Sequence, residues 1–248
     1  MSCKRECKQC KLCLYRFYTV VEDAVKTLGI LLEFIGPAGV GKSTLRSSAL
    51  ARHWANWVSP PPEHKHQQAS LYSNSAHYDL ILMKAARLAS RRNLNSLQQT
   101  TLLNYHTKIV MQDLTLAQRD SHLNVVLDEG LIHNFAAELS ILPRSTFTNL
   151  VTMRALIYLR PDQPETVVKR LLDRAAAGHV LTHHQGLSDT ELLSLTIESV
   201  SYLDQVTDRL AEIGLPILKL VAELPLTVCV DKCIDFVETL LGPVRDIN

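Results

Sequence analysis

A glycine-rich segment that runs into a lysine and two hydroxyl side chains is the part of the chain best suited to chemistry. Its order of glycine, four residues, glycine, lysine and serine is that of a loop that binds phosphate between a strand and a helix. Glycines let consecutive backbone N–H groups turn toward one anion, and the start of a helix adds further unpaired N–H groups. We therefore predict a nucleoside triphosphate site made of Gly36, Pro37, Ala38, Gly39, Val40, Gly41, Lys42, Ser43 and Thr44.

Lys42 and Ser43 have individual roles in this prediction. The Lys42 ammonium would face the β- and γ-phosphates of ATP, and the Ser43 hydroxyl would bind Mg²⁺. The alternative is a glycine-rich turn that carries Lys-Ser by chance. The apolar segment 31–35 before the loop and the helical pattern after it argue against that alternative, because the phosphate-binding motif requires this context.

Two carboxylates follow a second apolar segment, which ends at Leu127. In folds with a phosphate-binding loop, an acid at the end of the partner strand holds Mg²⁺, so we predict Asp128 as a metal ligand. Glu129 comes next, at the edge where open α/β sheets bind ligands, and its carboxylate could polarise a water or a substrate hydroxyl. The alternative is a strand that ends in acidic turn residues without a catalytic role.

Composition narrows the classes of partner. The chain has 248 residues, with 26 Lys and Arg against 25 Asp and Glu, so no bulk charge favours nucleic acid or an anionic membrane. No apolar run approaches the roughly 18 residues of a membrane-spanning helix, and the first residues lack the apolar core of a signal peptide. We therefore expect a cytoplasmic protein that binds neither nucleic acid nor membrane.

Cysteines are concentrated at the N-terminus, at Cys3, Cys7, Cys10 and Cys13. Their close spacing could hold a metal, but structural zinc usually pairs two C-x-x-C knuckles across a longer loop, which is missing here. Free thiols on an extension are the preferred interpretation. Cys229, in an apolar segment, is expected to be a small buried hydrophobe.

Apolar periodicity predicts alternating strands and helices. The expected strands are 31–35, 69–72, 122–127, 155–159 and 226–230. The expected helices are 42–57, 78–119, 131–142, 147–151, 164–174, 188–213 and 231–241. Ser188 and Glu191 form a capping-box pattern at the start of the long helix near the C-terminus. This order predicts an α/β fold in three layers, with a mostly parallel five-stranded sheet flanked by helices.

We divide the chain into two parts. Residues 1–29 form the cysteine-rich tail and a short leading helix, and residues 30–248 form one domain with a helical insert at about 78–119. Arginines 87, 91 and 92 interrupt the insert, where they could line a pocket for an anionic substrate. A solvated helix face is the preferred interpretation of these three arginines.

The motifs together resemble the thymidylate kinase-like branch of the phosphate-loop nucleoside and nucleotide kinases. The resemblance rests on Gly36–Thr44, Val125–Gly130, Leu156–Arg174 and Leu226–Asp231. It implies a lid at about 161–188, in which Arg170 and Arg174, four residues apart on one helix face, stabilise charge on the phosphoryl group being transferred. The family generally has Asp-Arg where this chain has Asp128-Glu129-Gly130, and its thymidine-binding pattern is not found in 60–120.

The sequence favours a kinase that uses ATP and Mg²⁺ to phosphorylate a small-molecule acceptor, nucleoside-like or another metabolite. Lys42, Glu129, Arg170 and Arg174 would be its catalytic residues. An ATPase that hydrolyses nucleotide to drive a conformational switch is the alternative, because an Asp-Glu pair after an apolar strand is typical of such proteins. A nucleotide-binding scaffold is a third interpretation, and the sequence leaves a homodimer open.

Overall fold

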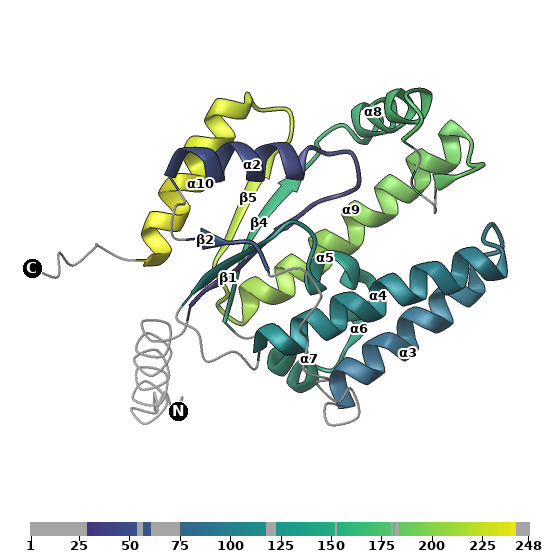
Figure 1. Cartoon of the computed structure of the whole chain (residues 1–248), viewed down its shortest axis with the longest axis horizontal. Coiled ribbons are helices and arrows are strands. Elements are labelled where there is room, and N and C mark those ends of the chain that lie inside the picture. The colour runs from purple at the N-terminus through teal and green to yellow at the C-terminus, as the bar shows by residue number, and fades with distance from the viewer. Residues whose placement is uncertain are drawn as a thin grey trace, which may run out of the picture.

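A parallel β-sheet forms the centre of the protein, with helices on both faces (Figure 1). This computed structural model describes residues 29–53, 57–60, 75–117, 123–151, 153–179, 181 and 184–241. The strands are β1 (Leu31–Ile35), β2 (Trp57–Val58), β3 (Asn124–Leu127), β4 (Arg154–Arg160) and β5 (Ile217–Val221). They are ordered β2-β3-β1-β4-β5, and every pairing is parallel.

The helices form the two outer layers. They are α2 (Lys42–His53), α3 (Ser75–Ser90), α4 (Ser96–Ala117), α5 (Leu131–Asn134), α6 (Ala136–Ile141), α7 (Arg144–Val151), α8 (Pro164–Ala176), α9 (Asp189–Glu212) and α10 (Leu226–Leu241). In Figure 1, α2 and α10 lie together on one face of the sheet, and α9 crosses the other. Each face has its own hydrophobic core, and the core on the α9 side continues into α4, α6 and α7.

The central strand β1 shows why this sequence makes such a sheet. Leu32, Phe34 and Ile35 are fully buried, with Leu32 and Phe34 in one core and Ile35 in the other. A strand covered on both faces is expected to be an apolar run rather than an alternating one. The predicted three-layer α/β fold with a five-stranded sheet is confirmed, and the described sheet is entirely parallel.

The predicted position of the fifth strand is wrong. Residues 226–230 begin α10, and β5 is the earlier segment Ile217–Val221, which pairs with β4. Cys229, Cys233 and Val237 lie on the buried side of α10, at the four-residue spacing of an amphipathic helix. The burial predicted for Cys229 is therefore confirmed, although its strand is not.

Three further predicted helices differ in their bounds or are divided. The first helix ends at His53 rather than at residue 57, because Trp57 and Val58 pair with β3 as β2. The insert is a pair of helices, α3 and α4, that turn back on each other around residues 91–95 (Figure 1). Likewise, the predicted helix 131–142 is divided at Phe135 into α5 and α6.

The capping box at the start of α9 is confirmed: the Glu191 N–H donates to Ser188 Oγ, and the Ser188 N–H donates to Glu191 Oε2 at 2.8 Å. The cysteine-rich tail, its leading helix and the strand predicted at 69–72 lie outside the described residues. Among the helices that are described, none has the length and apolar character needed to cross a membrane. The division into tail, domain, insert and lid stays a prediction.

Candidate active site

The glycine-rich loop connects β1 to α2 and passes against the end of β4. A Cβ atom on Gly36 would lie 2.4 Å from the carbonyl oxygen of Leu159, so only glycine fits there. Gly36, Gly39 and Gly41 all have positive φ angles, of 149°, 81° and 108°. Such angles are readily accessible to glycine alone and let the loop turn back toward the start of α2. The loop therefore has the strand-loop-helix context that its spacing predicts.

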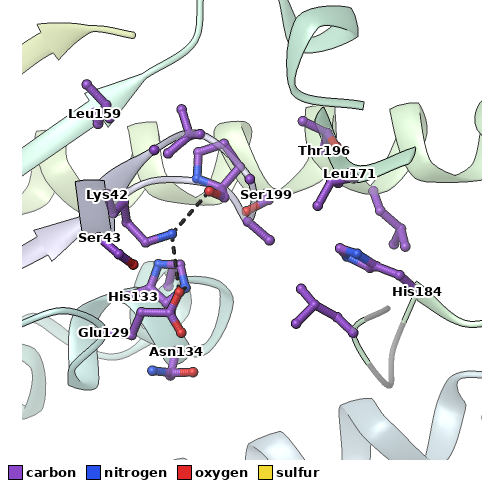
Figure 2. A pocket seen from close by; sticks show the side chains of 18 of the residues that line it. Lys42, Ser43, Glu129, His133, Asn134, Leu159, Leu171, His184, Thr196 and Ser199 are labelled. Atoms are coloured by element: carbon purple, nitrogen blue, oxygen red, sulfur yellow. Dashed lines mark hydrogen bonds and ion pairs between the residues drawn. The ribbon is translucent and has the colours of Figure 1, made fainter. Parts of the chain in front are cut away.

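Lys42 points into this loop at the first turn of α2 (Figure 2). Its Nζ donates hydrogen bonds to the carbonyl oxygens of Gly36, at 2.8 Å, and Pro37, at 3.1 Å. The same atom lies 3.3 Å from Glu129 Oε1. Burial lowers the pKa of Lys42, and Glu129 and Asp128 oppose that shift. The ammonium group is thus held between the loop and the acid that follows β3.

Ser43 and Asp128 meet where β1 and β3 end side by side. The Ser43 hydroxyl donates to Asp128 Oδ2 at 2.8 Å. The other carboxylate oxygen, Oδ1, is buried and has no hydrogen-bond partner among the described residues, and Arg46 Nε lies 3.8 Å from it. A hydroxyl beside a carboxylate with a spare oxygen suits Mg²⁺, which takes one or two protein ligands and completes its shell with water and phosphate.

Glu129 is surrounded by groups that favour its charged form. Besides Lys42, His133 Nε2 lies 3.4 Å from Glu129 Oε1, and the Tyr105 hydroxyl lies 3.5 Å from Oε2. Burial raises the pKa of Glu129, but His133 and Lys42 outweigh it, so the net pKa lies below the ordinary value. At neutral pH the side chain is therefore a carboxylate that can accept a hydrogen bond or a proton.

The arginines of the predicted lid are on α8, which packs on the loop. Arg170 Nη1 donates to the carbonyl oxygen of Val40 at 3.1 Å. A Cβ on Gly39 would lie 2.9 Å from Leu171 Cδ2, which shows how closely α8 approaches. Arg174 lines the same cavity as Lys42 and His184; burial lowers the pKa of both groups, and the charge of Arg174 lowers both further. The structure thus brings Arg170 and Arg174 close to the glycine-rich loop.

These groups line one large cavity of about 1320 Å³. Its walls come from the loop, the ends of β3 and β4, and helices α3, α4, α8 and α9. In Figure 2, Lys42, Ser43 and Glu129 lie on one side, and Leu171, His184 and Thr196 lie on the other. Pockets for single drug-sized ligands occupy roughly 300–1000 Å³. The cavity therefore has room for more than one small molecule.

Sequence reasoning missed Glu33, a fully buried acid in the middle of β1. Its carboxylate accepts hydrogen bonds from the backbone N–H groups of Gly130, Ile132 and His133, at 3.0, 3.2 and 2.7 Å. Arg154 Nη1 lies 3.7 Å from it, and Arg154 also binds Asp113. Glu33 therefore fixes the backbone that directly follows Glu129. A charged residue inside an otherwise apolar central strand was the available signal.

The charge of Glu33 should make stability depend on pH. Burial raises its pKa from 4.5 to about 7, against the opposing effects of Arg154 and the N–H donors of His133 and Ile132. Between these two values the folded protein binds a proton that the unfolded chain has released. The contribution of Glu33 is therefore largest below pH 4.5 and declines as the pH rises through about 7, by up to about 3 kcal/mol.

Urea unfolding of the wild type and of Glu33→Gln between pH 4.5 and 8 measures this decline. Because glutamine does not titrate, we expect the free energy of unfolding of the wild type to fall more steeply with pH than that of the variant. Other titrating groups contribute to both curves and cancel in the difference. Parallel curves would contradict the raised pKa.

Two of the three arginines of the insert do not lie on a solvated helix face, which was the preferred interpretation of the sequence. Arg87 and Arg91 line the cavity, so the prediction of a solvated face is wrong for these two residues. Arg92 is exposed in the turn after α3, as predicted. The four N-terminal cysteines lie outside the described residues.

No protein-family model and no curated protein sequence matches the chain. Solved structures that are similar to the chain include deoxyadenosine kinase from M. mycoides with bound dCTP, at a TM-score of 0.47 and 12% identity, with 85% of this chain and 100% of that chain covered. Shikimate kinase from Bacteroides thetaiotaomicron has a TM-score of 0.46 and 14% identity, with 84% and 98% covered. Both neighbours are kinases, and at these values neither identifies the reaction of this chain.

Proposed function

We propose that this protein is a kinase that transfers the γ-phosphoryl group of ATP to a hydroxyl of a small-molecule acceptor. The observation that carries the proposal is the single cavity that extends from Lys42 and Glu129 to a second wall on α3 and α9. A phosphotransferase needs such a space, because donor and acceptor must lie in contact within one site shielded from water.

Each residue of the loop side has a role in that reaction. The N–H groups of the loop and Lys42 bind the β- and γ-phosphates, and Arg170 and Arg174 on α8 add positive charge from the opposite side. Glu129 accepts the proton of the acceptor hydroxyl. The acceptor oxygen forms a bond to the γ-phosphorus while the bond from that phosphorus to the bridging oxygen breaks, and ADP leaves with that oxygen.

Mg²⁺ would be held by Ser43 and Asp128, whose buried Oδ1 atom is free of hydrogen bonds within the described residues. The ion would supply positive charge that neutralises the phosphates. Asp128 itself needs no proton transfer. Its position beside Ser43 orients the carboxylate toward the loop, and Arg46 offsets part of its charge.

A nucleotide hydrolase is the alternative, and one observation favours it. Glu129 is already ionised and held beside Lys42, as a carboxylate that orients an attacking water would be. Such an enzyme needs no second substrate, so the wall on α3 and α9 would have no role in its chemistry.

Consumption of ATP with and without candidate acceptors distinguishes the two functions. We expect purified protein with Mg²⁺ and ATP to release ADP slowly when no acceptor is present. One class of compounds from a library of hydroxyl-bearing metabolites should increase this rate, and mass spectrometry should detect the phosphorylated acceptor. A rate that no acceptor changes, with inorganic phosphate as the product, would favour the hydrolase.

Glu129→Gln should separate binding from catalysis. Glutamine keeps the size of the side chain but cannot accept a proton, so turnover should fall by about 10²- to 10⁴-fold. Nucleotide affinity should change little, because the loop and Lys42 remain. Steady-state turnover and fluorescent-nucleotide titration measure the two effects. Glu165→Gln, which changes an exposed acid on α8, is the matched control. Unchanged turnover would reduce Glu129 to a structural acid.

A further inference from the structure

A row of alternating charges lies where α3, α6 and α9 meet, and its members Lys84, Arg87, Arg91 and Glu198 line the cavity. Lys84 Nζ lies 2.9 Å from Glu138 Oε2, and Arg87 Nη1 lies 3.7 Å from Glu138 Oε1. Arg87 Nη2 lies 3.1 Å from Glu198 Oε1, and Arg91 Nη2 lies 3.8 Å from Glu198 Oε2. Three cations share two carboxylates, so the row carries one excess positive charge.

The inner part of this row is built into the core. The side chains of Lys84 and Glu138 are only 7% and 3% exposed, and the Lys84 ammonium lies 5.0 Å from the centre of the Phe135 ring. The Arg87 guanidinium lies 4.7 Å from the centre of the Tyr202 ring. Burying ion pairs is costly and often adds no stability over apolar packing. A row of five charges in this position therefore suggests a function in recognition.

Arg91 is the outer end of the row and the least neutralised member. Its side chain is 25% exposed, the carboxylate it pairs with, Glu198, is shared with Arg87, and no side-chain hydrogen bond of Arg91 is found among the described residues. Burial and the charge of Arg87 lower its pKa. A guanidinium has five N–H donors in a planar fork, and those of Arg91 are available on the cavity side.

Arg91 lines the same cavity as Lys42 and Glu129. Arg91 and His184 both line the cavity, and Arg174 and Arg91 add to the effect of burial in lowering the pKa of His184. Figure 2 shows His184 across the cavity from Lys42 and Glu129. An acceptor that occupies this space can therefore face Glu129 with one end and Arg91 with the other.

We propose that Arg91, supported by Arg87, binds an anionic group of the acceptor, either a carboxylate or a phosphate ester. This inference rests on the proposed kinase function and names the chemical class of its second substrate. The fork of an arginine matches the two oxygens of either group in a bidentate contact. A neutral acceptor would displace water from Arg91 without replacing its hydrogen bonds, which disfavours binding.

Anion binding can be measured without turnover. The protein is saturated with Mg²⁺ and a non-hydrolysable ATP analogue, so that the glycine-rich loop is filled, and is then titrated with inorganic phosphate or with acetate. We expect saturable stabilisation in thermal unfolding by one of these anions, and the more effective anion distinguishes a phosphate ester from a carboxylate. Arg91→Gln should weaken this binding by about 10- to 100-fold.

Arg92→Gln is the matched control, because it removes the same charge from the neighbouring position, which is exposed and does not line the cavity. It should bind the anion as the wild type does. Equal binding by wild type and Arg91→Gln, or absence of saturable binding, would overturn the proposal. Equal losses in both arginine variants would also overturn it, because they would show an effect of net charge alone.

Turnover provides an independent test. Hydroxy acids are compared with their amides, and phosphate monoesters with the corresponding unphosphorylated alcohols, as acceptors with ATP and Mg²⁺. We expect phosphorylation only in an anionic set, and Arg91→Gln should raise the KM for that acceptor while the KM for ATP stays within about twofold of wild type. If a neutral acceptor were preferred, the proposed kinase function would stand, but the inference of an anionic acceptor would be overturned. Hydrolysis of ATP that no acceptor changes would overturn both the proposed kinase function and this inference.

Discussion

Lys42→Ala should abolish function, with turnover reduced by at least about 10²- to 10³-fold. The side chain supplies a charge inside the loop, where its Nζ contacts two backbone carbonyls and Glu129. Alanine leaves those carbonyl oxygens facing the phosphates with no cation between them. We also expect nucleotide affinity to weaken by about 10- to 100-fold, as for the loss of a charge-assisted hydrogen bond. Turnover assays and nucleotide titration measure the two effects.

The controls for Lys42 separate charge from fold. Lys232→Ala removes a lysine that is exposed on α10 and should leave both measurements unchanged. Lys42→Arg keeps the charge in a larger, planar group, and we expect it to restore binding only in part. Thermal unfolding shows whether each variant is folded. If a folded Lys42→Ala protein bound ATP and turned it over as the wild type does, the proposal of a nucleotide site in this loop would be wrong.

Short sequence patterns explain why the glycine-rich loop and Asp128 could be predicted as parts of the candidate site. The spacing of Gly36, Gly41 and Lys42 requires a particular loop geometry, so the sequence determines the structure there within a few residues. The prediction for Asp128 has the same basis, because a strand with an acid at its end is expected beside that loop. The structure brings Ser43 and Asp128 together at 2.8 Å.

Short apolar segments account for the errors in the fold. Residues 226–230 contain a run of apolar side chains that fits a buried strand or one turn of a buried helix equally well. Only the later buried positions, Cys233 and Val237, reveal the helical period of α10. The true strand, Ile217–Val221, carries Lys219 in its middle, which pairs with Asp208 on α9. That pair is a tertiary contact, and no local pattern predicts it.

The residues that sequence reasoning misjudged depend on distant partners. Arg87 and Arg91 have the spacing of a solvated helix face, and only their contacts with Glu138 and Glu198 show that they line a cavity. Glu33 contacts backbone N–H groups about 100 positions later in the chain. In both cases the deciding contacts join elements whose packing a single sequence does not give.

Glu33 and Gly130 should behave as one unit when both are changed. A Cβ on Gly130 would lie 2.7 Å from the Glu33 carboxylate and 2.8 Å from Leu127 Cδ1. The backbone of Gly130 is extended, at φ −102° and ψ −152°, which any residue can adopt. Gly130→Ala is therefore costly for steric reasons alone, and we expect it to lower the free energy of unfolding by about 1–3 kcal/mol.

Glu33→Ala should lower the free energy of unfolding by about 3–5 kcal/mol, because it leaves Arg154 with one carboxylate fewer and three N–H groups without their acceptor. In the double variant the carboxylate that blocks the new methyl group is gone. The combined loss should therefore be smaller than the sum of the two single losses by at least about 1 kcal/mol. Urea unfolding of the four proteins gives this coupling energy, with Glu238→Ala, at an exposed position on α10, as the control for loss of an acid.

Positioning of Glu129 predicts a second effect that a purely structural role for Glu33 does not. Glu33→Gln keeps one acceptor oxygen, so it should be much more stable than Glu33→Ala. We expect its kcat to be lower than that of the wild type, while its KM for ATP is unchanged. Faster amide hydrogen exchange in residues 130–133, with the loop 36–44 unaffected, would identify the cause as movement of the backbone after Glu129. Additive stabilities within about 0.5 kcal/mol, or a kcat that follows stability alone across these variants, would show that Glu33 does not act through that backbone.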